Sequence, residues 1–127
     1  MVKIAVKGDG IPKPAGPYSP AIKVGDFVFC AGQVGRNPAT GEIGTTIEEQ
    51  TRQVLLNLQS VLKAAGTSLG SAVKTTVFMA DRNEFSRMNT EYAKFFPVDP
   101  PARSTVGVTL PPGIKVEIEL VAYIGAK

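Results

Sequence analysis

The spacing of apolar residues changes sharply at Thr46, and this change restricts the fold more than any other feature of the chain. From Thr46 the sequence reads TIEEQTRQVLLNLQSVLKAAG, in which apolar side chains recur every three or four residues, as along one face of an amphipathic helix. Thr46 and Glu49 have the spacing of a capping box, and Gly66 is a typical C-terminal stop signal. We therefore predict one long helix between Thr46 and Gly66.

Outside this helix, several short segments alternate apolar and polar residues, which is the period of β-strands. A turn at Gly25 and Asp26 predicts that two of these segments form a hairpin. The predicted strands cover residues 3–8, 21–24, 27–33, 72–80, 103–109 and 115–124. Their apolar faces include Val73, Thr75, Val77 and Met79 in one segment, and Val116, Ile118, Leu120 and Ala122 in the last.

A second helix is predicted over residues 81–96, with Asp81 or Asn83 as its cap and a proline-rich segment after its end. Its core-facing residues are predicted to be Phe85, Met88, Tyr92 and Phe95 or Phe96. The order of strands, helix, strand, helix and two strands predicts an α+β fold with two helices on one face of a five- or six-stranded mixed sheet. The other face must then be solvated or meet another subunit.

Composition restricts the chemistry. The chain of 127 residues fits a single domain over residues 1–127. It has no histidine, and its one cysteine, Cys30, lies in an apolar run that predicts a buried thiol; a zinc site of the usual kind, a Ser–His or Cys–His pair and an intrachain disulfide are therefore excluded. The net charge is only +3 and the basic residues are scattered, which does not indicate a nucleic-acid partner. Without a signal segment or a membrane-spanning apolar run, we expect a cytoplasmic protein.

Arg103 is the first candidate functional residue. It begins the strand in PPARSTVGV, where alternation places it on one side with Thr105 and Gly107. Small neighbours leave room beside the guanidinium, which is what an anionic ligand needs. The alternative is an ordinary surface arginine at the start of a strand.

Pairing of the last two strands as a hairpin through the loop LPPG would bring acidic residues close to Arg103. One register places Thr105 opposite Glu117 and Arg103 opposite Glu119, whereas a slip of one residue separates them. Glu117 and Glu119 are then either a solvated strand face or internal partners of Arg103.

Three further residues have both a functional and a structural interpretation. Gly32, inside a strand, exposes backbone to a ligand or another chain, or it marks a bulge or a place of tight packing. Tyr18, mounted between prolines, presents a phenol to a site, or it packs for its area alone. Asn89, among apolar helix positions, hydrogen-bonds across an interface, or it faces solvent.

In order along nearly the whole chain, the segments GPYSPAIKVGDFVFCAGQVG, QTRQVLLNLQSVLKAAG, VKTTVFMAD, FSRMNTEYAKFF, PPARSTV and KVEIELVA resemble the RidA family, also known as the YjgF/YER057c/UK114 family. The resemblance implies a chorismate-mutase-like fold that assembles as a homotrimer, with three clefts between subunits. It also implies an enamine/imine deaminase that hydrolyses 2-aminoacrylate and related products of pyridoxal-phosphate enzymes to 2-keto acids and ammonia, without a metal or organic cofactor.

Transferred by resemblance, the catalytic pair is Arg103, which holds the substrate carboxylate, and Glu117, which positions water. Tyr18, Gly32 and Asn89 then line the cleft, and Thr105 lies beside Arg103. The chain departs from many members at Ala31, where they have serine, and at Thr105, where several have cysteine. Both residues are small, so we expect an altered substrate preference and retained activity.

Two other functions use the same features. A trimer that senses small 2-keto acids without turnover would share every pocket residue with the deaminase. The family also includes proteins described as endoribonucleases or translation inhibitors, although a chain without histidine and without a basic stripe is poorly suited to cleaving RNA.

Overall fold

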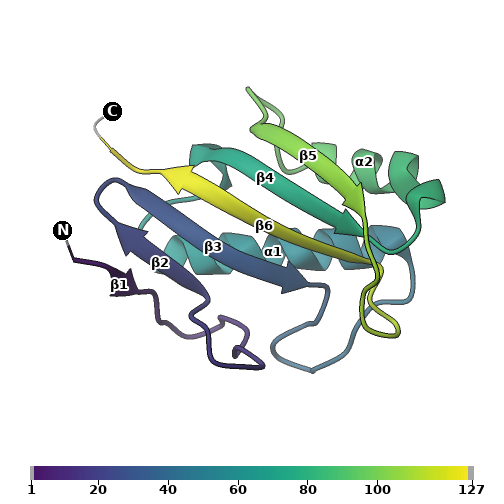
Figure 1. Ribbon diagram of the computed structural model, residues 1–127, viewed down its shortest axis with the longest axis horizontal. Helices are drawn as coiled ribbons and strands as arrows, with labels where there is room; N and C mark the ends of the chain where they lie inside the picture. Colours follow the sequence, from purple (N-terminus) through teal and green to yellow (C-terminus); the bar gives the residue numbers. More distant parts are fainter. Residues whose placement is uncertain (1, 126–127) are drawn as a thin grey trace.

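The computed structural model describes residues 2–125, in which the chain forms a mixed sheet of six strands with two α-helices on one face (Figure 1). This confirms the predicted α+β class. The strands are β1 (Ile4–Ala5), β2 (Ala21–Val24), β3 (Phe27–Val34), β4 (Ala72–Met79), β5 (Ala102–Gly107) and β6 (Val116–Tyr123). The helices are α1 (Ile47–Ala64) and α2 (Phe85–Ala93), and two short 3₁₀ turns lie at Leu69–Ser71 and Arg82–Glu84.

The strand order is β1-β2-β3-β6-β4-β5, and only the pair β4–β5 is parallel among the described strands. The proposed hairpin between the last two strands is therefore wrong, because β4 lies between β5 and β6. The chain from β4 crosses over through α2 to reach β5, and a parallel neighbour requires such a crossover. In the observed register Thr105 lies beside Val77, which pairs with Ile118, whereas Glu117 pairs with Phe78.

Helix α1 begins and ends as its sequence predicts. The Glu49 N–H donates to Thr46 Oγ1 at 3.1 Å, and the Thr46 N–H donates to Glu49 Oε1 at 3.2 Å, which completes the capping box. Gly66 has a φ of 90° just after the helix, a conformation that glycine adopts without strain. The helix packs its apolar stripe on the sheet through the fully buried residues Val54, Leu55, Leu58, Val61 and Leu62.

Two buried amides of α1 hold the ends of the central strands. Gln50 donates to the carbonyls of Gly44 and Gly113, each at 2.8 Å, and accepts from the Lys115 N–H at 2.8 Å. Asn57 donates to the carbonyl of Val34 at 3.1 Å. Since buried amides are costly unless they are paired, these contacts fix where β3 ends and where β6 begins.

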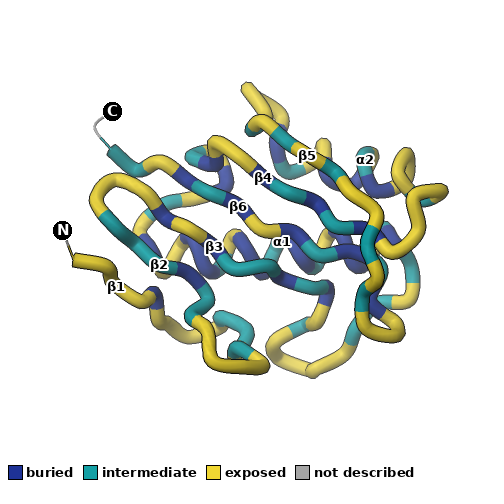
Figure 2. The backbone as a smooth tube through the Cα atoms, in the orientation of Figure 1, coloured by how far each residue is buried: buried dark blue, intermediate teal, exposed yellow. Residues whose placement is uncertain are grey.

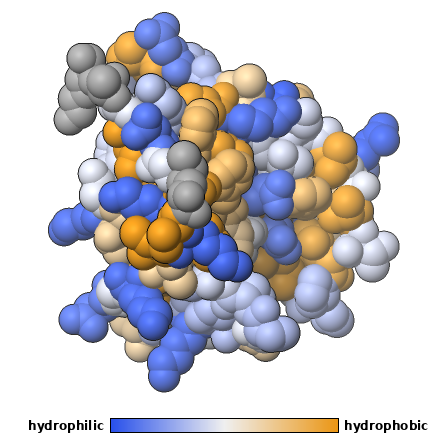
Figure 3. Space-filling view, turned by 60° about the vertical axis from the view of Figure 1, so that its left-hand side comes forward, coloured by the Kyte–Doolittle hydropathy of each residue, from blue (hydrophilic) through white to orange (hydrophobic). Residues whose placement is uncertain are grey.

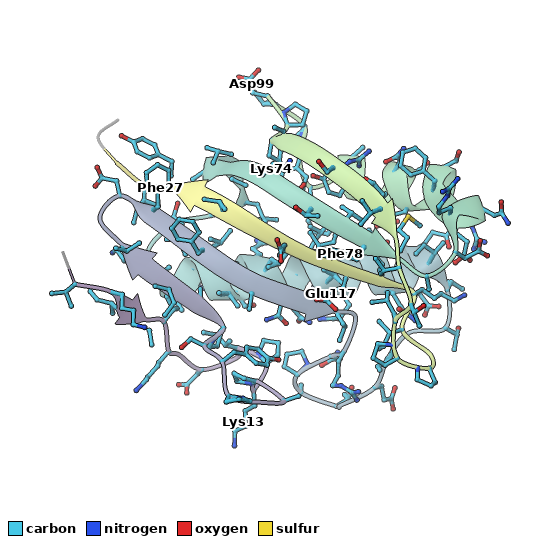
Figure 4. The ribbon with its side chains drawn as sticks, in the orientation of Figure 1. Lys13, Phe27, Lys74, Phe78, Asp99 and Glu117 are labelled. Carbon is cyan, nitrogen blue, oxygen red and sulfur yellow. The ribbon has the colours of Figure 1, made fainter. Side chains whose placement is uncertain are left out.

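The face of the sheet that points away from the helices is left open in one chain. Buried and exposed residues alternate along β4 and β6 (Figure 2), and Phe27, Phe78 and Glu117 lie on the side opposite the helices (Figure 4). Val73, predicted to face the core, is exposed because the β4–β6 register shifts between Ala72 and Lys74. Seen from the end with the termini, the surface carries exposed hydrophobic side chains among hydrophilic ones (Figure 3).

The second helical segment is shorter at both ends than the predicted helix over residues 81–96, because the α-helix runs only from Phe85 to Ala93. Asp81 caps a 3₁₀ turn by accepting from the Asn83 N–H at 2.9 Å, and α2 starts only at Phe85. Met88 and Tyr92 are buried as predicted, whereas Phe85 remains 40% exposed and lies against Arg103 of the edge strand β5. None of the helices in the described part of the chain is long and apolar enough to cross a lipid bilayer.

Candidate functional site

Arg103 lies on the edge strand β5, where aromatic rings of α2 hold its guanidinium. Its Cζ atom is 4.8 Å from the ring centroid of Tyr92 and 5.6 Å from that of Phe85, both within the range of cation–π attraction. The Tyr92 hydroxyl is in turn hydrogen-bonded to Thr75 Oγ1 at 2.7 Å in a buried contact. The guanidinium is therefore half-buried and held in one orientation.

No carboxylate within residues 2–125 lies within ion-pair distance of Arg103. The alternative in which Glu117 or Glu119 neutralises it inside one chain is thus wrong. A partly desolvated cation without a counter-charge is costly, so the position is suited to receiving an anion.

Two polar atoms lie near this cation without a hydrogen-bond partner in the described part of the chain. They are Thr105 Oγ1, on the same side of β5 as Arg103, and Asn89 Oδ1, on α2 between Phe85 and Tyr92. A cavity of about 510 Å³ lies beside Thr105, and Phe85 also lines it. Buried polar atoms normally have partners, so Thr105 and Asn89 can serve a ligand bound at this edge.

Glu117 lies on the other face of the sheet, in the middle of β6. The β3–β6 register shifts between Cys30 and Gln33, so β3 has a bulge at Ala31 and Gly32. A Cβ atom at Gly32 would lie 2.9 Å from Glu117 Cδ and closer still to a carboxylate oxygen. The structural interpretation of Gly32 is confirmed here, because it sits in the bulge and packs closely against the Glu117 carboxylate. Its contact with a ligand or another chain stays a prediction.

The environment of Glu117 favours its protonated form. Burial, and secondarily the negative charge of Glu119, raises the pKa of Glu117 above its ordinary value. A carboxylate with a raised pKa is a better proton acceptor near neutral pH than an exposed one.

Glu117 lines a cleft of about 490 Å³ between the loop before β2 and the β3 bulge. Tyr18, Ala31 and Gly32 also line this cleft. The Tyr18 side chain is 50% exposed, and its hydroxyl accepts from the Ala15 N–H at 3.2 Å. The phenol therefore sits at the rim of the cleft and does not pack in the core.

The six predicted site residues thus form two groups on opposite faces of the sheet. Arg103, Thr105 and Asn89 lie at the β5–α2 edge. Tyr18, Gly32 and Glu117 lie on the open face. The expectation that Arg103 and Glu117 share a face of one chain is wrong, because β5 pairs with β4 in a register that turns Arg103 toward the helices.

Sequence reasoning missed the residues that orient Arg103. Phe85 and Tyr92 were both assigned to the core, yet their rings lie next to the guanidinium. The signal was present in their spacing: Phe85, Asn89 and Tyr92 recur at i, i+4 and i+7 on one helix face.

Two other kinds of chemistry find no support in the described residues. Cys30 is buried, and burial raises the pKa of its thiol to about 12, so it remains protonated and unreactive. Among residues 2–125 no group of three or more Cys, Asp or Glu side chains is arranged to hold a metal ion.

Comparison with known families shows which family the chain belongs to. The family described as Endoribonuclease L-PSP matches residues 10–124. The chain belongs to this family. Its resemblance to the RidA/YjgF group is thereby confirmed, and so is the predicted fold.

Named members of the L-PSP family are similar along most of their length. The chloroplastic Reactive Intermediate Deaminase A of Arabidopsis thaliana is 45% identical over 124 residues, which cover 96% of this chain and 66% of that protein. The crystal structure of the YjgF gene product of E. coli has a TM-score of 0.90 at 38% identity and covers 94% of this chain and 98% of its own. The structure of E. coli TdcF with bound serine has a TM-score of 0.90 at 37% identity, with the same coverages.

Proposed function

We propose that this protein hydrolyses enamine and imine intermediates of the 2-aminoacrylate type to 2-keto acids and ammonia. The observation that carries the proposal is Arg103, a half-buried cation that is oriented by two rings and has no carboxylate partner in the described chain. It is supported by the similarity to a protein named Reactive Intermediate Deaminase A and to TdcF, whose structure holds serine, a small carboxylate.

In this proposal Arg103 binds the substrate carboxylate through two parallel N–H···O bonds. The stacking on Tyr92 keeps the guanidinium plane fixed, so the imine carbon is held in one position for attack. Thr105 and Asn89 supply further polar contacts from the same edge, with Oγ1 and Oδ1 as the atoms available.

Glu117 acts on water. It orients one molecule and accepts a proton from it as the oxygen adds to the imine carbon. Proton transfer to nitrogen then allows the C–N bond to break, so ammonia leaves and a carbonyl remains. Gly32 and Tyr18 shape the cleft in which this water would lie. The step needs neither a metal nor an organic cofactor.

The two groups of residues can meet only if different copies of the chain supply them. We infer that the open face packs against other copies in a homotrimer, as the family resemblance implies. Phe27, Phe29 and Tyr123 form an aromatic cluster there, with Phe27 and Tyr123 ring centroids 5.2 Å apart, and each of these residues is more than 40% exposed in one chain. Burial of such a cluster would supply the apolar area that a stable assembly needs.

The direct test generates 2-aminoacrylate from serine with a serine dehydratase and follows pyruvate formation. We expect the wild-type protein to accelerate pyruvate release, and Arg103→Ala to reduce kcat/KM by about a hundredfold because the substrate is no longer positioned. Arg52→Gln is the matched control, since Arg52 is exposed on α1 and lines neither of the two cavities. Equal rates with and without the protein would refute the deaminase, and retained binding of 2-oxobutanoate in that case would indicate a sensor.

A mixing experiment tests whether the site is shared between copies. Arg103→Ala and Glu117→Gln proteins are each expected to be inactive, whereas a co-refolded equimolar mixture should regain about one quarter of the wild-type activity, because random assembly joins an intact Arg103 edge to an intact Glu117 face at that frequency. A mixture as inactive as its components would contradict a shared site.

A further inference from the structure

We infer that Arg82 forms a second anion subsite beside Arg103, so that the preferred substrates are imines of dicarboxylic acids. This inference deepens the proposed function and rests on it. It names a substrate class, 2-imino acids that carry a second carboxylate, and assigns to Arg82 a role in specificity.

The backbone of β5 brings Arg82 into line with Arg103. Strand alternation puts Arg103, Thr105 and Gly107 on one side of β5. A Cβ atom at Gly107 would lie 2.8 Å from Arg82 Cδ and 3.0 Å from its Cγ, so the Arg82 stem rests on the bare glycine backbone. The absence of a side chain at Gly107 is therefore what admits this second arginine to the same edge.

The charges around Arg82 leave it without a partner in the described part of the chain. The neighbouring Asp81 carboxylate accepts from the Asn83 N–H at 2.9 Å, and Glu84 lies 3.6 Å from Arg87 and 3.5 Å from Lys115. Neither acid forms an ion pair with Arg82 within residues 2–125, and the Arg82 side chain is exposed. Two cations without a carboxylate partner in this part of the chain consequently share one edge of the sheet.

The space between the two cations suits a small dianion. Arg82, Phe85 and Thr105 line the same cavity of about 510 Å³, and Phe85 also contacts the Arg103 guanidinium. Four strand steps separate Arg103 from Gly107, a span of roughly 13 Å. The Arg82 stem rests at the Gly107 end of this span and the Arg103 guanidinium lies near Phe85 at the other, and the unpartnered Thr105 belongs to the strand between them. A dicarboxylate can then touch Arg103 with one end and Arg82 with the other.

The experiment compares the binding of 2-oxoglutarate and 2-oxobutanoate to the full chain by calorimetry. Both probes are stable keto acids, and they differ in the second carboxylate. We expect the wild-type protein to bind 2-oxoglutarate about three- to tenfold more tightly, the range for one added contact to a partly exposed charge. Arg82→Gln should bring the ratio close to one, and Arg82→Lys should keep part of the preference because it keeps the charge.

Two controls distinguish an effect of the Arg82 subsite from an effect of net charge and from loss of the Arg103 site. Arg52→Gln removes an exposed arginine that does not line the cavity and should keep the wild-type ratio, which excludes an effect of net charge alone. Arg103→Ala should weaken the binding of both keto acids. Equal affinity of the wild-type protein for both probes, or a ratio unchanged in Arg82→Gln, would overturn the inference.

The binding assay also distinguishes this inference from the proposed function. If the aminoacrylate assay shows no acceleration but Arg82→Gln abolishes the dicarboxylate preference, the deaminase is wrong and the subsite is supported. If acceleration is found and both keto acids bind equally, the subsite is wrong and the deaminase is supported.

Discussion

The charged groups on the two faces of the sheet are held in place by different means. At the β5–α2 edge, neighbouring side chains hold the charged group: the Arg103 guanidinium lies against the rings of Tyr92 and Phe85, and the Tyr92 hydroxyl is hydrogen-bonded to Thr75. On the open face, backbone geometry positions the charged group, because a bulge in β3 and the glycine at position 32 leave space for the Glu117 carboxylate.

This difference follows from position in the sheet. Arg103, on the edge strand β5, points to the helix side, where the rings of α2 pack against its long side chain. Glu117, on the central strand β6, points to the open side, where the β3 bulge at Gly32 leaves room for its carboxylate. The two halves should therefore respond to different kinds of substitution.

The largest effect is expected at Gly32. Gly32→Val places a branched side chain where the Glu117 carboxylate lies, and should reduce kcat about a hundredfold by displacing the base. Overpacking at this position should also cost about 1–3 kcal/mol of stability. Pyruvate formation and thermal unfolding measure the two effects.

Gly70→Ala is the matched control for this substitution. The nearest atom to a Cβ at Gly70 is Ser68 Oγ at 3.7 Å, so the added methyl group has room. Binding of 2-oxobutanoate should persist in Gly32→Val, because the Arg103 edge is intact. Full activity in Gly32→Val would show that the close approach of Gly32 to Glu117 is irrelevant to function.

A smaller effect on activity is expected from substitution of Tyr92, at the β5–α2 edge. Tyr92→Leu removes the ring beneath Arg103 and should raise KM about three- to tenfold, with a smaller change in kcat, because a cation–π contact is lost. Tyr92→Phe keeps the ring and should keep KM close to the wild-type value. It should nevertheless lose about 1–2 kcal/mol of stability, since buried Thr75 Oγ1 loses its partner. An equal KM in all three proteins would break the assignment of Tyr92 as a positioning residue.

The smallest expected effect is a displacement of the pH profile. Glu117 must be ionised to accept a proton, so activity should fall as the pH falls through its raised pKa. Glu119→Gln removes the like charge that contributes to the raised pKa of Glu117, so the acidic limb of kcat/KM should move to lower pH. Glu42→Gln, in an exposed loop, should leave the limb in place. A limb that stays fixed or moves to higher pH in Glu119→Gln would contradict the role of Glu117.

Much of the fold could be predicted because it depends on local signals. The capping box at Thr46, the stop at Gly66 and the turn after β2 are read from neighbouring residues, and all three are observed. The inward face of β6 was also predicted correctly, since alternation needs no knowledge of the neighbouring strand. Phe85 was misplaced because a helix pattern does not reveal where the sheet ends.

The pairing of the last two strands shows where local reasoning stops. A short loop between β5 and β6 favours a hairpin, but the parallel contact between β4 and β5 places β4 between them. That choice depends on residues far apart in the chain, and it decides which face Arg103 and Glu117 occupy.

The sequence by itself determines the types of the secondary-structure elements and the small set of side chains that can transfer protons or bind anions. Both depend on residue identity and on near neighbours in the chain. Which of those side chains lie together was settled by strand order, register and helix placement. These are collective properties of the packed molecule, since a shift of one strand moves every side chain on it to the opposite face.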